Sequence, residues 1–539
     1  MSHCLLRPTL LALVCLWGLS GCGRNRSSVT CDQLCDVGAK QCSGSDLIIC
    51  ESDAQGCTGW ALLKACASCA NAQCVGCLEG EREVCAPVGT CADGWRTCVD
   101  GNFSSCQWGK GVSEEICDGL DNDCDGDTDE EVTNCCDGTP CDTSPWLSHT
   151  KGDGNSMILP VQLADDGAGN YYIAGYLTGS PVFIDKMLTA NGPKDAFLCK
   201  LDQTGKLVWV HQWGGQQRDV AESVALGKDG SIYIGGYFEH AIDFDGHALQ
   251  EAGVGGFVTK LNADGSVVWA QHTGADIAHG VTGIQIGEQD SLIVAGQYAG
   301  TGVFGPTKLT TDAKEVFVAK LNTAGNYEWL THSKGGRSET LGVALAADGR
   351  IFITGHFTGD AAFGEQLLTT TDTAHGFLAR LSQGGNFDWA LDLGWGQGRG
   401  LAVDSAGDVI VLGNKYIAKH QPNGQAIWKT TIGGWGTDIL LDTDGDFLVT
   451  GYYFSTATFG TTTLKSNGGA DIFWSRLGKS GGLRWTRTAG GTWDDEPVGL
   501  AFHPSGNHVM AGTFTGKVTF GQQVADNVAL PHLFLWKMP

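Results

Sequence analysis

The sequence predicts an all-β protein: a seven-bladed β-propeller closed by its N-terminal strand and preceded by a small disulfide-rich domain. Three observations predict it. Similar segments recur through the second half of the 539 residues, Asp-Gly and Gly-Gly dipeptides separate their apolar runs, and most of the 22 cysteines fall between Cys31 and Cys141. Recurrent segments of this kind indicate a repeat architecture, and the dipeptides indicate hairpin turns.

Residues 1–21 are predicted to form a lipoprotein signal peptide. The apolar run from Leu10 to Leu19 is shorter than the ~20 residues that span a bilayer. It ends in Leu-Ser-Gly-Cys, which resembles the bacterial lipoprotein processing box, and this resemblance implies lipidation of Cys22. The alternative is an ordinary signal peptide with an incidental cysteine. Gly23 after Cys22 implies, by analogy with enteric bacteria, an outer-membrane lipoprotein that is surface-exposed or faces the periplasm.

Residues 22–30 are then a lipid-anchored linker, and acyl chains would hold the protein on the membrane at roughly 0.8 kcal/mol per buried CH₂. The formal net charge of -26 disfavours nucleic acid and anionic lipid surfaces as partners, since both attract clustered Lys and Arg. We therefore expect membrane contact through the lipid alone. No other apolar run approaches the length of a transmembrane helix.

Residues 31–113 are predicted to form a cysteine-rich disulfide domain. Dense cysteines in an exported segment with few large apolar residues indicate a stapled framework rather than a hydrophobic core. Zinc is the alternative, prompted by the pairs Cys66–Cys69 and Cys74–Cys77, but these pairs stand much closer than the ~15–20 residues usual in zinc ribbons. Cys199 stands apart and is expected to be a small buried residue.

Residues 114–144 contain an acidic motif, "EEICDGLDNDCDGDTDEE", that is predicted to bind a metal and to join the two domains. Alternating carboxylates in a tight loop supply the oxygen ligands that calcium prefers. The candidate ligands are Asp121, Asp123, Asp125, Asp127, Asp129 and Glu130, with Cys117 and Cys124 as disulfide candidates. The loop departs from an EF-hand because Val132 replaces the bidentate Glu and no amphipathic helices flank it, so thrombospondin-type calcium loops are closer.

The same stretch resembles a short motif of exported bacterial proteins, "E.CDG.DNDCDG..DE", and that family has been linked by name to copper. Residues 31–144 contain no His and no Met, however, and hard oxygen ligands favour calcium. Structural calcium is therefore the predicted cofactor. Copper and a plain acidic linker are the alternatives.

Residues 145–539 contain seven repeats. Segments such as "VALGKDGSIYIGGYF" and "VALAADGRIFITGHF" are each followed by a second block, as in "FVTKLNADGSVVWAQ". Tryptophans and phase-matched basic residues mark the repeats: Trp209, Trp269, Trp329, Trp389, Trp428 and Trp485, with Lys200, Lys260, Lys320, Arg380, Lys419, Arg476 and Lys537. Alternating apolar residues between hairpin signals predict four short strands in each repeat, and such units arranged radially make a propeller.

The segment "YLTGSPVFIDKMLTANGPKDAFLCKLDQTGKLVW" resembles the repeat of bacterial seven-bladed β-propeller proteins, and the resemblance covers roughly residues 145–539. The seventh repeat stops after its third strand, "HLFLWKMP". The missing fourth strand is similar to "PWLSHTKGDGN" at Pro145–Asn155, so the strand around Trp146 should pair with the strand around Phe534. This pairing would close the ring and remove an open edge.

The long connections between second and third strands share one face with the links between repeats, and insertions on one face predict a binding face. The fifth repeat lacks this connection, which leaves a notch near Asn414–Tyr416. The notch could admit a polymer or a peptide, and a simple loop deletion is the alternative. Acidic residues of the links could ring the channel mouth: Asp219, Glu222, Glu339, Asp438, Asp494, Asp495 and Glu496. Acidic loops that are simply solvated are the alternative.

No catalytic residues are predicted. "GKSGG" at Gly478–Gly482 fits G-x-S-x-G, but it aligns with the hairpin turns of other repeats. His149, His272 and His332 lie on outer strands and should point apart as exposed polar residues. The predicted function is binding or scaffolding, with an unknown protein or glycan ligand on the long-loop face. The alternatives are a propeller hydrolase or lyase acting on polysaccharide, and a copper-binding surface protein.

Overall fold

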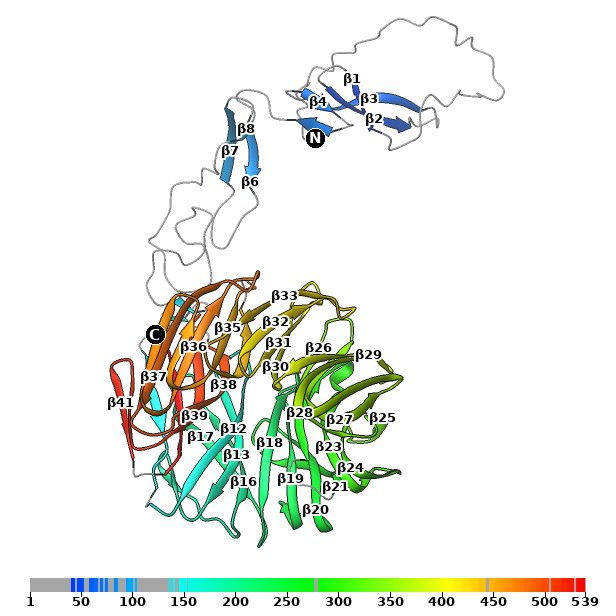
Figure 1. The fold of residues 1–539 in the computed structure, drawn as a ribbon. Helices are drawn as coiled ribbons and strands as arrows, with labels where there is room; N and C mark the ends of the chain where they lie inside the picture. Colours follow the sequence, from blue (N-terminus) through cyan, green and yellow to red (C-terminus); the bar gives the residue numbers. More distant parts are fainter. Residues whose placement is uncertain are drawn as a thin grey trace, which may run out of the picture. The chain divides into compact units, whose positions relative to one another are not determined.

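The computed structural model divides the chain into two compact parts, Met1–Thr133 and Asn134–Pro539 (Figure 1). It describes residues 145–539 except 153, 276–279, 443–444, 504–505, 528–529 and 539; before residue 145 it describes only short strands. Those strands are β1 (Lys40–Ser43), β2 (Asp46–Ser52), β3 (Thr58–Ala65), β4 (Ser68–Ala70), β5 (Gln73–Val75), β6 (Arg82–Cys85), β7 (Gly94–Val99), β8 (Asn102–Phe103), β9 (Cys135–Cys136) and β10 (Thr139–Pro140).

The second part is an all-β, propeller-like fold of antiparallel sheets, in which each repeat supplies four strands. Repeats 1 to 3 consist of β12 (Met157–Asp165), β13 (Tyr171–Thr178), β16 (Asp195–Leu201) and β17 (Leu207–Trp213); β18 (Asp219–Leu226), β19 (Ile232–Phe244), β20 (His247–Leu261) and β21 (Val267–Ala275); and β22 (Val281–Ile286), β23 (Leu292–Phe304), β24 (Thr307–Leu321) and β25 (Tyr327–His332). A short 3₁₀ turn, η1 (Glu288–Asp290), joins β22 to β23.

The other repeats follow the same order. Repeats 4 to 6 consist of β26 (Arg337–Leu345), β27 (Ile351–Phe363), β28 (Gln366–Leu381) and β29 (Phe387–Trp395); β30 (Gly398–Val403), β31 (Val409–Gly413), β32 (Tyr416–His420) and β33 (Ala426–Thr431); and β34 (Trp435–Leu441), β35 (Phe447–Phe459), β36 (Thr462–Leu477) and β37 (Leu483–Gly491). Repeat 7 combines β38 (Glu496–Phe502), β39 (His508–Phe514), β42 (His532–Lys537) and β11 (Leu147–His149).

The last repeat joins the two ends of this part. The strand β11 pairs antiparallel with β42, with Leu147 opposite Trp536 and His149 opposite Phe534, and this confirms the predicted pairing. Colours in Figure 1 accordingly run through the part from cyan to red and meet again there. Because β42 also pairs with β39, the end of the chain is held between two strands rather than at a free edge.

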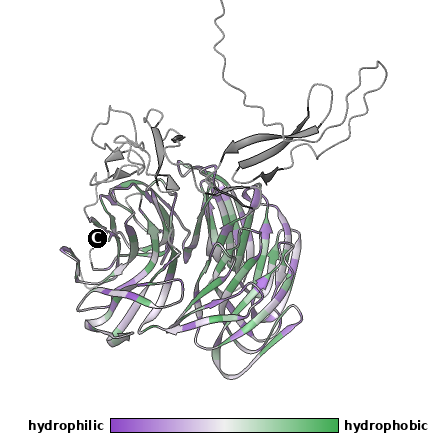
Figure 2. Cartoon of the chain, turned by 90° about the horizontal axis from the view of Figure 1, so that it is seen from above, coloured by the Kyte–Doolittle hydropathy of each residue, from purple (hydrophilic) through white to green (hydrophobic). Residues whose placement is uncertain are grey.

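Packing between neighbouring sheets forms the core. One buried cluster joins repeat 1, including Phe197, to Val509 and Leu535 of repeat 7, and similar clusters lie between the other neighbours. In Figure 2 the hydrophobic colour runs along these strands and alternates with hydrophilic positions. Cys199 is fully buried, as predicted, and burial raises the pKa of its thiol. Among the described residues, no helix is long and apolar enough to cross a membrane.

The first strand of every repeat carries a β-bulge at the same position, opposite a glycine of the second strand. In repeat 2, a Cβ on Gly236 would collide with the carbonyl oxygen of Val220, so only glycine fits there. A bulge re-aims the side chain of the extra residue. The seven re-aimed residues are Val161, Glu222, Thr282, Leu341, Arg399, Thr437 and Val498.

The long connections between second and third strands differ from the expected open loops. In repeats 2, 3, 4 and 6 the two strands continue past the sheet as a two-stranded ribbon with a tight turn, such as Asp245-Gly246. Separate short pairs form the ribbons of repeats 1 and 7: β14 (Val182–Phe183) with β15 (Lys186–Met187), and β40 (Lys517–Phe520) with β41 (Gln523–Asp526).

Each ribbon folds back onto its own sheet through a pair of phenylalanines. The ring centroids lie 4.6–5.4 Å apart in the pairs Phe183–Phe197, Phe244–Phe257, Phe304–Phe317, Phe363–Phe377, Phe459–Phe473 and Phe520–Phe534. Aromatic pairs of this kind contribute roughly 0.5–1.5 kcal/mol beyond their buried area. The connections are therefore packing elements, and their length alone does not indicate a binding face.

Candidate functional site

The first strands of the repeats enclose a cavity of about 810 Å³ at the centre of the second part. All seven residues that the bulges re-aim line it, from Val161 on β12 to Val498 on β38. The recurring bulge thus builds the cavity. The glycine of the second strand lets the first strand approach closely at the bulge, and the side chain of the extra residue points into the cavity. The seven residues of this ring are the apolar Val161, Leu341 and Val498, the threonines Thr282 and Thr437, and the charged Glu222 and Arg399.

Three tyrosines stand at the same position of their second strands and also line the cavity: Tyr176, Tyr237 and Tyr452. The ammonium of Lys194 lies 4.0 Å from the ring centroid of Tyr176, a cation–π contact inside the site. Each tyrosine directly follows the glycine opposite the bulge and stands a few residues before the connection to the third strand, so the three lie toward the face that carries the ribbons and the links. Aromatic walls with a few charged groups are typical of ligand sites.

Arg399 is held in place by two side chains. Its Nε donates to Oδ1 of Asn414 at 3.1 Å, and Nη2 donates to Oε1 of Gln397 at 3.3 Å. Burial raises the pKa of the nearby Glu496 carboxyl, and Asp494 adds to the rise while Arg399 opposes it. An oriented guanidinium close to a carboxyl gives this side of the cavity both a hydrogen-bond donor and an acceptor.

Asp438 and Gln162 line the cavity, but their side chains are hydrogen-bonded to the backbone of neighbouring first strands. Asp438 accepts the N–H groups of Leu500 and Ile439, each at 2.8 Å, and Gln162 accepts the N–H of Val224 at 2.7 Å. Each contact from Asp438 to Leu500 and from Gln162 to Val224 ties one first strand to the next. Desolvation raises the pKa of Asp438 to about 6, against the effect of its two backbone donors.

The acidic residues of the links do not form the expected ring at the mouth. Glu222, Asp438 and Glu496 line the cavity, whereas Asp219 and Asp495 are fully buried. Glu339 pairs with Lys314 at 2.8 Å, and Asp494 accepts the N–H of Ala470 at 2.8 Å. The solvated-loop alternative also fails for Asp219 and Asp495, because both side chains are fully buried and each accepts a backbone N–H from its own loop.

Two buried carboxyl pairs repeat one arrangement. Asp219 N–H donates to Lys194 O at 2.9 Å beside Asp195, and Asp495 N–H donates to Ala470 O at 2.7 Å beside Asp471. Both Asp219 and Asp495 accept an N–H at 2.8 Å from a glycine four residues earlier. Burial raises the pKa of each of these two to about 7, and the neighbouring aspartate contributes.

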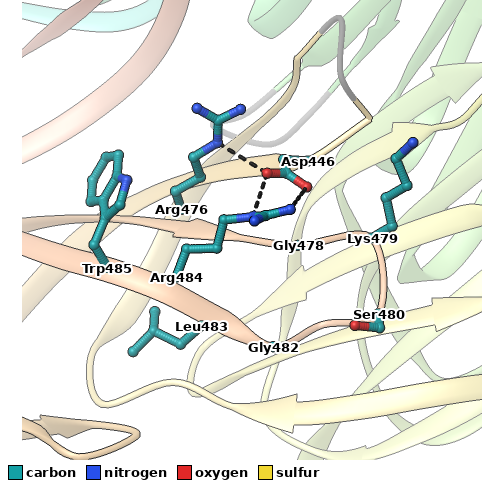
Figure 3. Close-up of a pocket in the computed structure, with 9 residues that line it drawn as sticks. All are labelled: Asp446, Arg476, Gly478, Lys479, Ser480, Gly482, Leu483, Arg484 and Trp485. Carbon is teal, nitrogen blue, oxygen red and sulfur yellow. Dashed lines mark hydrogen bonds and ion pairs between the residues drawn. The ribbon is translucent and has the colours of Figure 1, made fainter.

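The G-x-S-x-G match is a hairpin turn, as predicted. Gly478 N–H donates to Gly482 O between β36 and β37, and Ser480 is exposed. Figure 3 shows the shallow hollow around it, in which Asp446 accepts Arg476 Nε at 3.1 Å and Arg484 Nη2 at 3.0 Å. Phase-matched basic residues of other repeats make similar local pairs: Lys320–Glu328, Arg380–Asp388 and Lys419–Asp404.

The three histidines of the outer strands are less exposed than expected. Nε2 of His272 lies 3.3 Å from Glu251, and Nδ1 of His332 lies 3.0 Å from Glu315. His149 packs against Phe514 with 5.5 Å between ring centroids. The three histidines contact residues of different repeats and do not converge on one site.

Several predicted site residues lie outside the described residues. These are the lipidation site Cys22, the metal candidates Asp121, Asp123, Asp125, Asp127, Asp129 and Glu130, and the disulfide candidates Cys117 and Cys124. Where the structure is described, no group of three or more His, Cys, Asp or Glu side chains could hold a metal ion.

No known family model matches the chain. It is 20% identical over 394 residues to the uncharacterized WD repeat-containing protein L264 of Acanthamoeba polyphaga mimivirus, covering 62% of this chain and 27% of that protein. It is 25% identical over 208 residues to the regulatory protein FlaEY of Caulobacter vibrioides, covering 35% and 22%. The chain thus spans about a quarter of the length of these curated relatives.

Solved structures with a similar arrangement include the WD40 β-propeller domain of Doa1, at a TM-score of 0.41 and 10% identity over 73% of this chain and 97% of that one. BamB from Moraxella catarrhalis is similar at a TM-score of 0.33 and 14% identity, over 72% and 100% of the two chains.

Proposed function

We propose that the second part is a seven-bladed β-propeller that binds a protein or glycan ligand at the mouth of its central cavity, so that the protein is a binding or scaffolding module. One observation carries the proposal: the same bulge in every first strand turns a side chain into one cavity of about 810 Å³. The ring is regular in backbone but varied in side chain. Such a site offers a rigid frame whose chemistry can differ from one position to the next.

The composition of the mouth supports binding. Tyr176, Tyr237 and Tyr452 provide broad ring faces at low cost in side-chain entropy, and Arg399 is already oriented by Asn414. Tyrosine and arginine are also the residues that dominate binding energy at protein interfaces. The hydrolase or lyase alternative is less well supported, because the carboxylate of Asp438 is engaged by two backbone N–H groups.

A pair of arginine variants tests the ligand site. The full-length chain, immobilised, is exposed to cell-envelope proteins and to a glycan array. Arg399→Ala should lose at least ~10-fold in affinity for the retained ligand, which corresponds to ~1.4 kcal/mol. Arg484→Ala is the matched control and should retain it, because Arg484 lies on β37 beside the Gly478–Gly482 turn and does not line the central cavity. Equal retention by both variants, or no specific ligand at all, would contradict the proposal.

We also propose that lipid on Cys22 anchors the protein to the outer membrane, where it is surface-exposed or faces the periplasm. Leu-Ser-Gly-Cys and Gly23 support this. Metabolic labelling with a palmitate analogue should mark the wild type and not Cys22→Ser. Labelling of both chains would refute it.

The acidic motif is proposed to bind structural calcium through Asp121, Asp123, Asp125, Asp127, Asp129 and Glu130, in a segment stapled by disulfides that include Cys117 and Cys124. Alternating carboxylates without His or Met support calcium over copper. Calorimetric titration of the full-length chain with calcium should release heat that Asp123→Asn and Asp125→Asn together abolish. A heat unchanged in that variant would place calcium elsewhere, and no heat at millimolar calcium would exclude the site.

A further inference from the structure

At six junctions between consecutive repeats, the ribbon of one repeat covers the end of the outer strand, or the link, of the repeat before it. Thr273 at the end of β21 pairs with Phe304 of the repeat 3 ribbon, and Gly490 of β37 pairs with Thr519 of the repeat 7 ribbon. Single bridges do the same at two more places, Lys334 with Ala362 and Lys151 with Val182.

The two other covered junctions use packing contacts. Trp213, at the end of β17, is 3% exposed under the repeat 2 ribbon: Phe244 lies 5.5 Å away between ring centroids, and Asp245 accepts its Nε1–H at 3.2 Å. At the end of repeat 5, Ile432 is buried in one cluster with Ala457 and Phe459 of the repeat 6 ribbon. A ribbon over the preceding outer strand is therefore the rule of this fold.

The junction between repeats 4 and 5 breaks the rule. Strands β31 and β32 are joined by Asn414 and Lys415 alone, so repeat 5 has no ribbon. The end of β29 is accordingly uncovered: Trp395 is 63% exposed, and a Cβ on Gly394 would meet nothing within 4 Å. Trp213 shows how the fold treats a tryptophan in this region when a ribbon is present.

The third strand of repeat 5 also lacks the partner that a ribbon supplies. Tyr416 stands where the other repeats have the inner phenylalanine of the pair. The ammonium of Lys429 lies 4.0 Å from its ring centroid and donates to Leu393 O at 3.3 Å. The Tyr416 hydroxyl is buried and accepts or donates no hydrogen bond within the described structure. This hydroxyl is a polar group beside the uncovered strand end that an incoming segment could satisfy.

We propose that this junction accepts an extended segment of a partner polypeptide, which carries an aromatic residue and lies along the end of β29 as a ribbon does elsewhere. The occupant is a polypeptide because polypeptide fills the corresponding place at the six other junctions, in part through backbone pairing. Addition of a strand in this way gives affinity from backbone hydrogen bonds and specificity from side-chain contacts. None of Trp395, Tyr416 and Lys429 lines the central cavity, and the proposal does not depend on the proposed ligand there.

The test uses the fold's own ribbon as the probe. A labelled peptide with the sequence of residues 237–256, which covers Trp213 in repeat 2, is titrated with the full-length chain and followed by fluorescence anisotropy. We expect a Kd below about 1 mM. Trp395→Ala should weaken binding at least ~10-fold, and so should replacing Phe244 by Ala in the peptide. Trp493→Ala is the matched control, since Trp493 is also exposed (55%) on a link but lies at another junction.

A second variant tests the geometry. Residues 239–254 are inserted between Asn414 and Lys415, so that repeat 5 gains a ribbon in cis. Circular dichroism and thermal unfolding establish that the variant folds, and it should then no longer bind the peptide. Absence of peptide binding to the wild type, binding indifferent to Trp395→Ala, or undiminished binding to the folded insertion variant would each overturn the proposal.

Discussion

Replacing Asp219 by asparagine is expected to stabilise the protein above pH 7 and to reduce the dependence of its stability on pH. Asp219 is fully buried beside the buried Asp195, and its Oδ1 has no hydrogen-bond partner within the described structure. Burial raises its pKa from 3.8 to about 7; the charges of Asp195 and Glu239 add to the rise, and the Gly215 N–H opposes it. Lys194 and Arg218 are the basic residues of the two adjoining chain segments.

The sign follows from linkage. Because the folded pKa lies above the unfolded value, the stability that this group contributes is fully present below about pH 4 and is lost as the pH rises through about 7. The difference between 3.8 and about 7 is roughly three units, and each unit corresponds to ~1.36 kcal/mol, so the loss is at most about 4 kcal/mol. Asparagine is neutral, like the protonated acid, and keeps an acceptor for Gly215 N–H.

Urea unfolding of the full-length chain from pH 5 to pH 8, followed by tryptophan fluorescence, measures the effect. Asp219→Asn should unfold with a free energy that falls less between these pH values than that of the wild type. Asp495→Asn should behave alike, because its pKa is also raised to about 7, and the double variant should show the two effects added. The exposed Asp185→Asn is the matched control. If Asp219→Asn were destabilised equally at every pH, the buried-proton argument would be wrong.

Three further outcomes are expected. Deletion of residues 530–539 removes β42 and should abolish cooperative unfolding of the second part by circular dichroism, because β42 pairs with both β39 and β11; an unchanged melting temperature would disprove this closure. Gly236→Ala should cost more than ~2 kcal/mol in urea unfolding, whereas Gly482→Ala, where a Cβ meets nothing within 4 Å, should cost under ~0.5; equal costs would remove the steric argument. Tyr416→Phe should leave stability unchanged or raise it by about 1 kcal/mol, since it removes a hydroxyl without a partner, and a clear loss would reveal a hidden partner.

Much of the fold could be predicted because the same residue types recur at the same positions of successive repeats. The spacing of Trp209 and its successors identified the fourth strands, and the phase of "PWLSHT" against them predicted that β11 completes the last sheet. The bulge was not predicted, although its signal is present: a glycine recurs in every second strand, at positions such as Gly175 and Gly236. Its steric cause is a carbonyl oxygen of another strand, which sequence alone does not place.

The candidate site was only partly predictable for a related reason. Acidic residues of the links look alike in sequence, yet Glu222 lines the cavity, whereas Asp219, three residues earlier, is fully buried and does not line it. What separates them is the bulge, which points one side chain inward, and the turn around Gly215, which offers an N–H to the other. Both depend on pairings across the sheet rather than on residue type.

The packing of the ribbons affects where a binding site for a partner should be sought. Long connections on one face predict binding only when their residues are free. Here the ribbons are engaged by a recurring phenylalanine pair, such as Phe363–Phe377, and by contacts with the preceding repeat. A repeat that omits its ribbon therefore exposes more than one that keeps it. Trp395 is exposed because repeat 5 has no ribbon, and not because a longer loop presents it. In a closed repeat fold in which each ribbon covers the preceding repeat, the repeat without a ribbon leaves a strand end uncovered. A segment of a partner polypeptide can take the place of the missing ribbon there.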